Sequence, residues 1–237
     1  MGRCSRLTDE MLRDVQPEIL DELDAADPRA IHSRRDLQRV NALMGHPRMI
    51  AQALPDALGG ACVVELGAGD GTFLLNVAKR IGKQSNVRAV LVDQRPSVSA
   101  ETQAGFASAG WQIEIAEADV FEWLRRPQHV RTDVTVANLF LHHFREPELA
   151  RLLQGASEQT KRFVACEPLR STASVIGASL LRFVGCNGVT MHDARASVHA
   201  GFRDRELSNL WPADGRWHLS EQRSGRFTHM FVADHAA

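Results

Sequence analysis

The sequence predicts an α/β protein built on a doubly wound, mostly parallel sheet. From residue 61 to 167, short apolar β-rich runs alternate with segments of helix length. Apolar runs of this kind, without polar alternation, are typical of parallel strands that helices cover on both faces. Two further strand-like runs at the C-terminal end, joined by Arg223-Ser224-Gly225, have the pattern of a hairpin. The sequence therefore predicts a seven-stranded sheet that ends in an antiparallel hairpin strand.

Composition and charge narrow the function classes. The chain has 237 residues, of which 44% are hydrophobic and 24% charged, enough apolar mass for a large core. Lys and Arg total 28 against 29 Asp and Glu, so bulk charge gives no attraction for nucleic acid. The longest apolar stretch, 175–189, is too short to span a bilayer, and no long apolar segment marks a secretory signal. We expect a cytoplasmic protein that binds neither nucleic acid nor membrane.

The first part of the chain, 1–60, is predicted to be a helical cap. Apolar residues at helical spacing from Met11 to Leu23 follow Thr8-Asp9-Glu10, which predicts a first helix. Asp27-Pro28 is typical of an N-cap with proline at the first helical position, and the helix that follows should end at Gly45. Its inward residues should be Ile31, Leu37, Val40 and Leu43. A short helix should begin at Pro47 and end before Pro55.

The second part, 61–237, should hold the ligand-binding sheet. We expect strands at 62–66, 88–93, 112–116, 133–139 and 162–167, with helices at 71–81, 97–109, 120–125 and 147–159. Residues 171–210 should form two or three helices without a strand, and such an insertion would act as a lid. The hairpin strands should be 217–221 and 227–233. The apolar residues Leu180, Leu181 and Phe183 should form either the core of this lid or a face for a homodimer.

A glycine loop follows the first predicted strand, with Gly67, Gly69 and Gly71 at alternate positions. Glycine permits positive φ and close approach of a ligand, and in a doubly wound sheet this loop lies where ligands bind. The spacing GxGxG differs from the GxGxxG of dinucleotide sites. Glu65 and Asp70 would also repel a diphosphate, whereas S-adenosylmethionine carries an ammonium, a sulfonium and no phosphate.

Two acids after the next strands have the spacing of nucleoside-binding groups. Asp93 ends the second strand, 22 residues after Gly71, where a carboxylate can accept both hydroxyls of a ribose. Ribose is common to NAD and S-adenosylmethionine, so Asp93 does not separate them. Asp119 can bind an adenine amino group with Val120 or Phe121 against the ring, and it can also cap the helix that follows.

Four segments in order, at 63–73, 92–94, 118–121 and 137–144, resemble the motifs of the class I SAM-dependent methyltransferases, whose fold is Rossmann-like. The resemblance covers residues 61–167, and the final hairpin fits it. Segments 34–41, 139–144 and 191–195 are further similar to small bacterial methyltransferases that act on quinol, phenol or natural-product rings. In that family an Asp or Asn often precedes Leu-Arg after the fifth strand, whereas this chain has Glu167-Pro168-Leu169-Arg170.

The resemblance implies a cofactor site with S-adenosylhomocysteine as the product. In it the three glycines shape the loop, and Glu65 orients loop amides or meets the ammonium through water. Asp93 would hold the ribose with Gln94 beside the adenine, and the remaining contacts would come from Asp119 and Val120 to the adenine and from Asn138 and Leu139 to the methionine.

An arginine of the second helix is a further candidate for the cofactor site. Arg35 shares a helix face with Arg39, which is repulsive without an acidic partner. Arg35 would therefore either bind the cofactor carboxylate or pair with Asp36 or Asp27.

The candidate catalytic residues are His142 and His143, just after the fourth strand. One of them would be the general base for a hydroxyl acceptor, or both would orient the loop. Met191, His192 and Arg195 would bind the acceptor from the lid, with Arg195 either meeting an acidic or oxyanionic group or remaining solvated. The four cysteines lack CxxC spacing and the lid histidines lack a convergent ligand set, so we expect no metal.

These observations favour an enzyme that transfers a methyl group from S-adenosylmethionine to a small aromatic or quinonoid acceptor, at a hydroxyl oxygen. Two alternatives stay open at this point. One is a binding or scaffold protein of the same fold without turnover. The other is an NAD-dependent oxidoreductase, which the glycine spacing, the loop acids and the absence of tyrosine disfavour.

Overall fold

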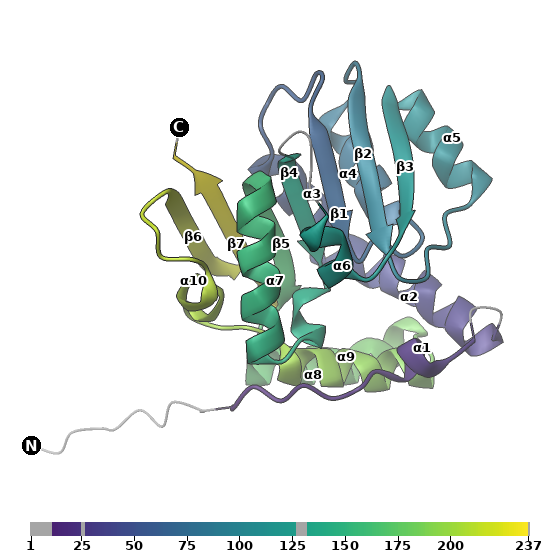
Figure 1. Cartoon of the computed structure of the whole chain (residues 1–237). Helices are drawn as coiled ribbons and strands as arrows, with labels where there is room; N and C mark the ends of the chain where they lie inside the picture. Colours follow the sequence, from purple (N-terminus) through teal and green to yellow (C-terminus); the bar gives the residue numbers. More distant parts are fainter. Residues whose placement is uncertain (1–10, 25–26, 127–131, 237) are drawn as a thin grey trace, which may run out of the picture.

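The computed structural model describes residues 11–24, 27–126 and 132–236. Its centre is a seven-stranded sheet in the order β3-β2-β1-β4-β5-β7-β6 (Figure 1). The strands β1 to β5 are parallel, and β7 is antiparallel to both β5 and β6. The strands are β1 Cys62–Leu66, β2 Val87–Asp93, β3 Trp111–Glu117, β4 Thr132–Asn138, β5 Thr160–Pro168, β6 Trp217–Ser224 and β7 Thr228–His235. The predicted fold class and its terminal hairpin are confirmed.

Helices cover both faces of the sheet and create two hydrophobic cores. On one face, α3, α4 and α5 pack side chains such as Ile50, Leu74 and Phe106 against the strands. On the other, α6, α7 and α10 contribute side chains such as Trp123 and Leu152. These helices are α3 His46–Ala53, α4 Thr72–Ile81, α5 Ala100–Ser108, α6 Val120–Arg125, α7 Glu146–Gln159 and α10 Glu206–Leu210. Burial on both faces explains why the strands read as continuous apolar runs.

A second group of helices lies at the carboxyl ends of the parallel strands, below the sheet in Figure 1. It comprises α1 Ile19–Glu22, α2 Pro28–Met44, the 3₁₀ turn η1 Leu141–His143, α8 Thr172–Leu180, the 3₁₀ turn η2 Leu181–Val184 and α9 Gly188–Ala200. Helix α9 contacts α1, α2, α8 and η1. Helices are therefore present in the predicted insertion at 171–210, but only part of it has the predicted place. Helix α9 packs on α8 and on the N-terminal helices α1 and α2 over one end of the sheet, whereas α10 lies against α7 and β6 and is outside this lid.

The N-terminal segment differs from the prediction. Residues 11–18 are not helical, and only Ile19–Glu22 forms a short helix. The extended segment is anchored along α9, where the amide of Asp14 donates to the carbonyl of His199 and the Arg13 guanidinium donates to the carbonyl of Ala200. The apolar spacing predicted a helix here. The segment instead forms hydrogen bonds with α9, which is distant in sequence, and these take the place of hydrogen bonds within a helix.

Helix α2 begins and ends where the sequence predicts. The carboxylate of Asp27 accepts from the amide of Arg29 at its start, and Gly45 ends it with a φ of 74°. The predicted inward face is wrong in part, because Ile31 is 40% and Leu43 is 74% exposed. The buried face carries small and polar residues, Ala30, Ser33 and Asp36. Asp36 accepts from the amide of Asn187 and the hydroxyl of Thr190, so this face binds the start of α9 through hydrogen bonds rather than apolar packing.

The three apolar lid residues Leu180, Leu181 and Phe183 have different environments. Leu181 faces a cavity, whereas Leu180 and Phe183 are exposed.

Across the described residues, no helix combines the length and the apolar character needed to cross a membrane.

Candidate active site

The glycine loop joins β1 to α4 at the carboxyl edge of the sheet. Gly67, Gly69 and Gly71 have φ values of 72°, 54° and 71°, a region that favours glycine. A Cβ atom on Gly67 would lie 2.2 Å from the ring of Phe140, so this glycine also permits a close approach. A Cβ on Gly69 would meet nothing within 4 Å, because Gly69 faces open space.

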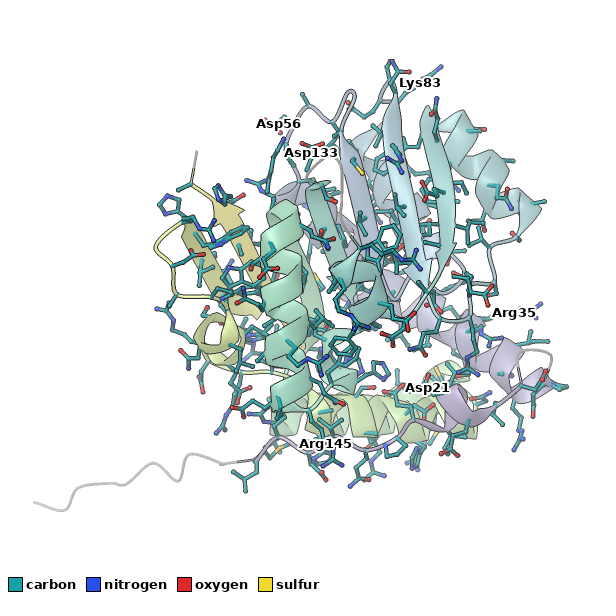
Figure 2. The ribbon with its side chains drawn as sticks, in the orientation of Figure 1. Asp21, Arg35, Asp56, Lys83, Asp133 and Arg145 are labelled. Atoms are coloured by element: carbon teal, nitrogen blue, oxygen red, sulfur yellow. The ribbon has the colours of Figure 1, made fainter. Side chains whose placement is uncertain are left out.

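A cavity of about 510 Å³ lies against this loop. The predicted residues that line it are Glu65, Gly67, Gly69, Asp93, Gln94, Val120, Asn138, Leu139, His142 and His143. Gly71 is not part of the wall, but it is the N-cap residue of α4, directly behind the loop. Helix α2 adds Arg34, Gln38 and Asn41, which the sequence analysis did not assign to the cofactor. Arg35 is exposed at the outer edge of the molecule and outside this wall (Figure 2).

Glu65 is a buried carboxylate that faces this cavity. Its side chain is 2% exposed, and its Oε2 atom has no hydrogen-bond partner among the described residues. Burial, with Asp70 and Asp93 nearby, raises the pKa of Glu65 well above its usual range. A buried acceptor without a donor is costly, and a cation in the cavity would relieve that cost. The wall therefore fits a ligand that carries an ammonium group.

Asp93 and Asp119 hold the loops around the cavity. Asp93 accepts from the amides of Gly69 and Arg95, both at 2.8 Å, which ties the end of β2 to the glycine loop. Asp119 caps α6 through the amides of Phe121 and Glu122 and accepts from Gln94 at 2.7 Å. The capping role predicted for Asp119 is thus present. Asp119 itself is not part of the cavity wall, which its neighbours Ala118 and Val120 line.

Asn138, at the end of β4, is held by a buried histidine. His46 contacts the Oδ1 atom of Asn138 at 2.7 Å through Nδ1 and the hydroxyl of Thr228 at 2.8 Å through Nε2. Burial lowers the pKa of His46 to about 4, although the Asn138 bond opposes this, so the ring is neutral at pH 7. Next to Asn138, Leu139 has a φ of 50°, an unfavourable conformation for leucine that is common at functional sites.

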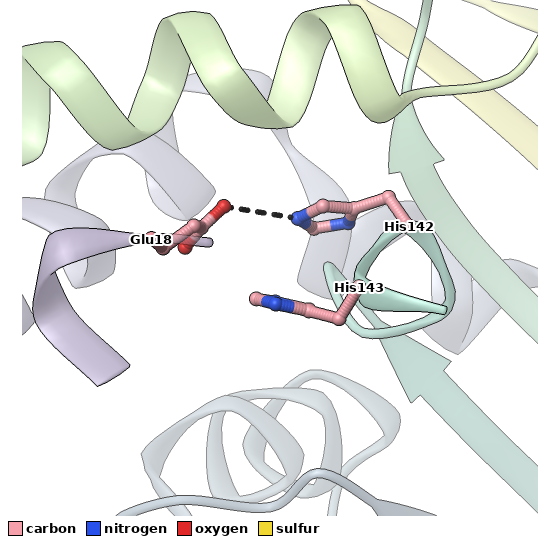
Figure 3. A group of neighbouring side chains, drawn as sticks. All are labelled: Glu18, His142 and His143. Carbon is pink, nitrogen blue, oxygen red and sulfur yellow. Dashed lines mark hydrogen bonds and ion pairs between the residues drawn. The ribbon is translucent and has the colours of Figure 1, made fainter. Parts of the chain in front are cut away.

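His142 lies between two carboxylates. Its Nδ1 is 2.7 Å from the carboxylate of Glu167. Its Nε2 is 3.3 Å from Glu18 of the N-terminal segment, the contact drawn as a dashed line in Figure 3. Burial would lower its pKa, but the hydrogen bonds and charges of Glu167 and Glu18 raise the pKa of His142 to about 9. Burial likewise opposes ionisation of Glu18, yet His142 lowers the pKa of Glu18 to about 2. This arrangement holds His142 as an imidazolium at neutral pH.

Glu167 also builds the turn that carries His142. Its carboxylate accepts from the amides of Phe140 at 3.0 Å and Leu141 at 2.8 Å. Burial alone would raise the pKa of Glu167, but the bond from His142, its charge and these amides lower it. The segment 167–170, which departs from the family pattern in sequence, thus supplies the carboxylate that orients His142.

His143 has a different environment. Its ring stacks on His142 with centroids 4.3 Å apart, and its Nδ1 is 3.5 Å from Asp21. Burial and the charge of His142 lower the pKa of His143, so this ring is neutral where its neighbour is charged. Ligand atoms of Glu18, His142 and His143 lie within 4.8 Å of one another, a geometry that a cation could occupy (Figure 3). Both nitrogens of His142 already have carboxylate partners, so the cluster is complete as an ion-paired network.

A second cavity, of about 220 Å³, lies between α2, α8 and α9. It shares Glu18, Leu20, Leu37, Leu139 and Ser197 with the wall of the first cavity. From α9 it receives Thr190, Asp193, Ala194, Ser197 and Val198. The predicted acceptor residues Met191, His192 and Arg195 lie on the same helix but outside the wall of both cavities. Which face of α9 points inward depends on packing against α2, and the local sequence did not reveal it.

Comparisons with known proteins agree with this geometry. A family model described as a methyltransferase domain matches residues 63–162. Residues 63–162 form a methyltransferase domain. Domains of this class use S-adenosylmethionine, and the match covers the glycine loop, Asp93 and both histidines of η1. A search of curated proteins finds no match.

Solved structures share the fold of this methyltransferase domain and of the helices around it. An O-methyltransferase family protein from Burkholderia thailandensis is 17% identical with a TM-score of 0.61, covering 90% of this chain and 61% of its own. The pyocyanin biosynthetic protein PhzM is 21% identical with a TM-score of 0.59, covering 89% and 60%. The mitomycin 7-O-methyltransferase MmcR is 18% identical with a TM-score of 0.57, covering 92% and 60%. The chain thus spans about three-fifths of the length of these structures.

Proposed function

We propose that this protein transfers a methyl group from S-adenosylmethionine to a hydroxyl oxygen of a small aromatic or quinonoid molecule. The observation that carries this proposal is the wall common to the two cavities. Glu18, Leu20, Leu37, Leu139 and Ser197 line both, so a group held in one cavity faces a molecule held in the other. Methyl transfer needs this alignment above all, because the donor is intrinsically reactive.

The larger cavity would hold the cofactor. Glu65 would offer its unpaired carboxylate to the ammonium, and the glycine loop would lie along the methionine part. Asp93 would accept from the ribose, with Gln94 and Val120 near the adenine. When bound, the cofactor supplies an activated methyl group.

His142 would accept the proton of the acceptor hydroxyl. Glu167 fixes the ring through Nδ1, which leaves Nε2 for the acceptor, as in other base-and-carboxylate pairs. Glu18 now occupies Nε2, and the ring is charged. A hydroxyl that takes the place of Glu18 removes one of the two carboxylates that hold the proton on His142. The pKa of His142 would then fall toward the range of a useful base.

Cofactor binding is the first test. Thermal unfolding of the full chain would be measured with S-adenosylhomocysteine, S-adenosylmethionine and NAD, each at about 100 times its Kd. Saturation at that level adds about 2.7 kcal/mol of stability. For a chain of this size that corresponds to a rise in Tm of about 5–10 °C. A shift with NAD alone would support the oxidoreductase alternative and contradict the proposal.

Turnover is the second test, because a scaffold protein would bind cofactor without transferring methyl groups. The protein would be incubated with labelled S-adenosylmethionine and a panel of phenols and quinols. His142→Gln should abolish methylation while S-adenosylhomocysteine still binds. His218→Gln, an exposed histidine of β6 outside both cavity walls, is the matched control and should retain methylation. Full activity in His142→Gln would refute the base role. Cofactor binding without transfer to any acceptor would favour the scaffold.

A further inference from the structure

The smaller cavity has mainly apolar walls. Side chains that point to it include Leu37 and Val40 of α2, Leu181 of η2, Val198 of α9 and Phe227 before β7. Its volume of about 220 Å³ is below the ~300–1,000 Å³ typical of sites for drug-sized ligands. The space therefore suits a molecule of one or two rings.

The polar groups in this wall already have partners. The hydroxyl of Thr190 donates to Asp36 at 3.1 Å, and that of Ser174 lies 2.9 Å from Ser171. The hydroxyl of Ser197 lies within hydrogen-bond distance of the Glu18 carboxylate and of the carbonyl of Asp193. Few polar groups of the wall are therefore available to hydrogen-bond a ligand. A strongly polar substituent would lose its hydrogen bonds to water without gaining equivalent ones in the cavity.

The charge in this wall has one sign. Of the described residues that line the cavity, the ionisable ones are Glu18 and Asp193, and none is Lys, Arg or His. Asp193 is 4% exposed and accepts from the amides of Ile19 and Leu20, both at 2.9 Å. Glu18 faces the end of the cavity nearest the cofactor, where it meets His142. With His142 charged, the row of Glu18, His142 and Glu167 still carries one net negative charge.

We infer that the acceptor is an uncharged, largely apolar hydroxylated ring, and that Glu18 excludes acceptors that carry a carboxylate. An anionic substituent would lose water in an apolar cavity, close to a carboxylate and without a cation to pair with. An uncharged ring loses little hydration free energy on entering the cavity. Its hydroxyl is the one polar group for which the Glu18 end of the cavity offers a hydrogen-bond partner. This inference rests on the proposed function, because it treats the smaller cavity as the acceptor site.

The lid arginine does not alter this selection. Arg195 was a candidate partner for an acidic acceptor, but it lies outside the wall of the cavity. The two carboxylates that do line the wall therefore determine its charge preference.

The test is a calorimetric titration of the full chain saturated with S-adenosylhomocysteine. The probes are ester and acid pairs on one-ring and two-ring scaffolds, starting with methyl 4-hydroxybenzoate and 4-hydroxybenzoate at pH 7.5. We expect at least one ester to bind at least tenfold more tightly than its acid. Glu18→Gln should narrow that ratio by weakening the repulsion of the acid. Glu22→Gln, an exposed glutamate on the same segment but outside the wall, is the matched control and should leave the ratio unchanged.

Each outcome bears on a different statement. Acids that bind as tightly as their esters, or a failure of every ester to bind while S-adenosylhomocysteine does, would overturn the inferred acceptor class and leave the cofactor site standing. An unchanged ratio in Glu18→Gln would overturn the role of Glu18. Failure of S-adenosylhomocysteine itself to bind would instead refute the proposed function.

Discussion

Replacing Gly67 by alanine should destabilise the protein much more than the same change at Gly69. Both glycines have positive φ, 72° and 54°, so each alanine takes a left-handed conformation that costs about 1–2 kcal/mol. At Gly67 the new Cβ would also lie 2.2 Å from the Phe140 ring, and displacing a packed ring costs about 1–3 kcal/mol more. The expected losses are therefore about 2–5 kcal/mol for Gly67→Ala and about 1–2 kcal/mol for Gly69→Ala.

Urea unfolding of the two variants without cofactor measures this difference. Titration with S-adenosylhomocysteine adds an independent readout, because the Cβ at Gly69 enters open space in the cofactor cavity. Gly69→Ala should therefore lose at least about tenfold in affinity, or about 1.4 kcal/mol, despite its smaller loss of stability. Equal unfolding free energies for the two variants would show that the ring of Phe140 moves at no cost, and the argument from close approach would fail.

Three further predictions concern single carboxylates. Glu65→Gln should raise the Tm of the cofactor-free protein at pH 7. The pKa of Glu65 is higher in the folded than in the unfolded protein, so at any pH above the unfolded-state pKa this carboxyl group lowers the stability of the fold. The same variant should weaken S-adenosylhomocysteine binding, and a lowered Tm would contradict this prediction. The kcat/KM should rise with pH toward about 9, where His142 loses its proton. Glu18→Gln should shift this rise to a pH lower by about 1–2 units, since Glu18 and Glu167 together raise the pKa of His142 from 6.5. A pH profile that the variant leaves unchanged would show that Glu18 does not affect the pKa of His142. Asp193→Asn should speed protease cleavage within residues 11–24, because the carboxylate accepts from the amides of Ile19 and Leu20, while amide exchange in the sheet stays as slow as in the parent protein.

The sheet could be predicted because its signals are local. An apolar run that enters three glycines and a helix defines both β1 and its loop, and burial on two faces marks the other parallel strands. The N-terminal segment could not be predicted in the same way. Apolar residues from 11 to 23 have helical spacing, but the segment binds α9 through contacts that span 173 to 187 residues of sequence, and only Ile19–Glu22 becomes helical.

The candidate site also contains residues that local sequence could predict and residues that it could not. Glu65, Asp93 and Asn138 lie at the carboxyl ends of β1, β2 and β4 and line the larger cavity, so their order and spacing along the sequence were enough to group them. Glu18 was missed because its partners, His142 and Ser197, come from distant elements. The sequence did hold one signal for the rest of the cluster, the unusual glutamate at position 167.

The two cavities draw on different parts of the chain, and this has a consequence for how such a protein can change. Of the described residues in α8 and α9, Ser197 alone lines the cofactor cavity, whereas both helices contribute to the smaller one. Substitutions in these helices can therefore reshape what the protein accepts without touching the glycine loop or the ends of β1, β2 and β4. A mutant library confined to residues 174–181 would therefore search for new substrates at constant cofactor affinity, because it leaves out Asp193, which holds the N-terminal segment in the wall of the larger cavity.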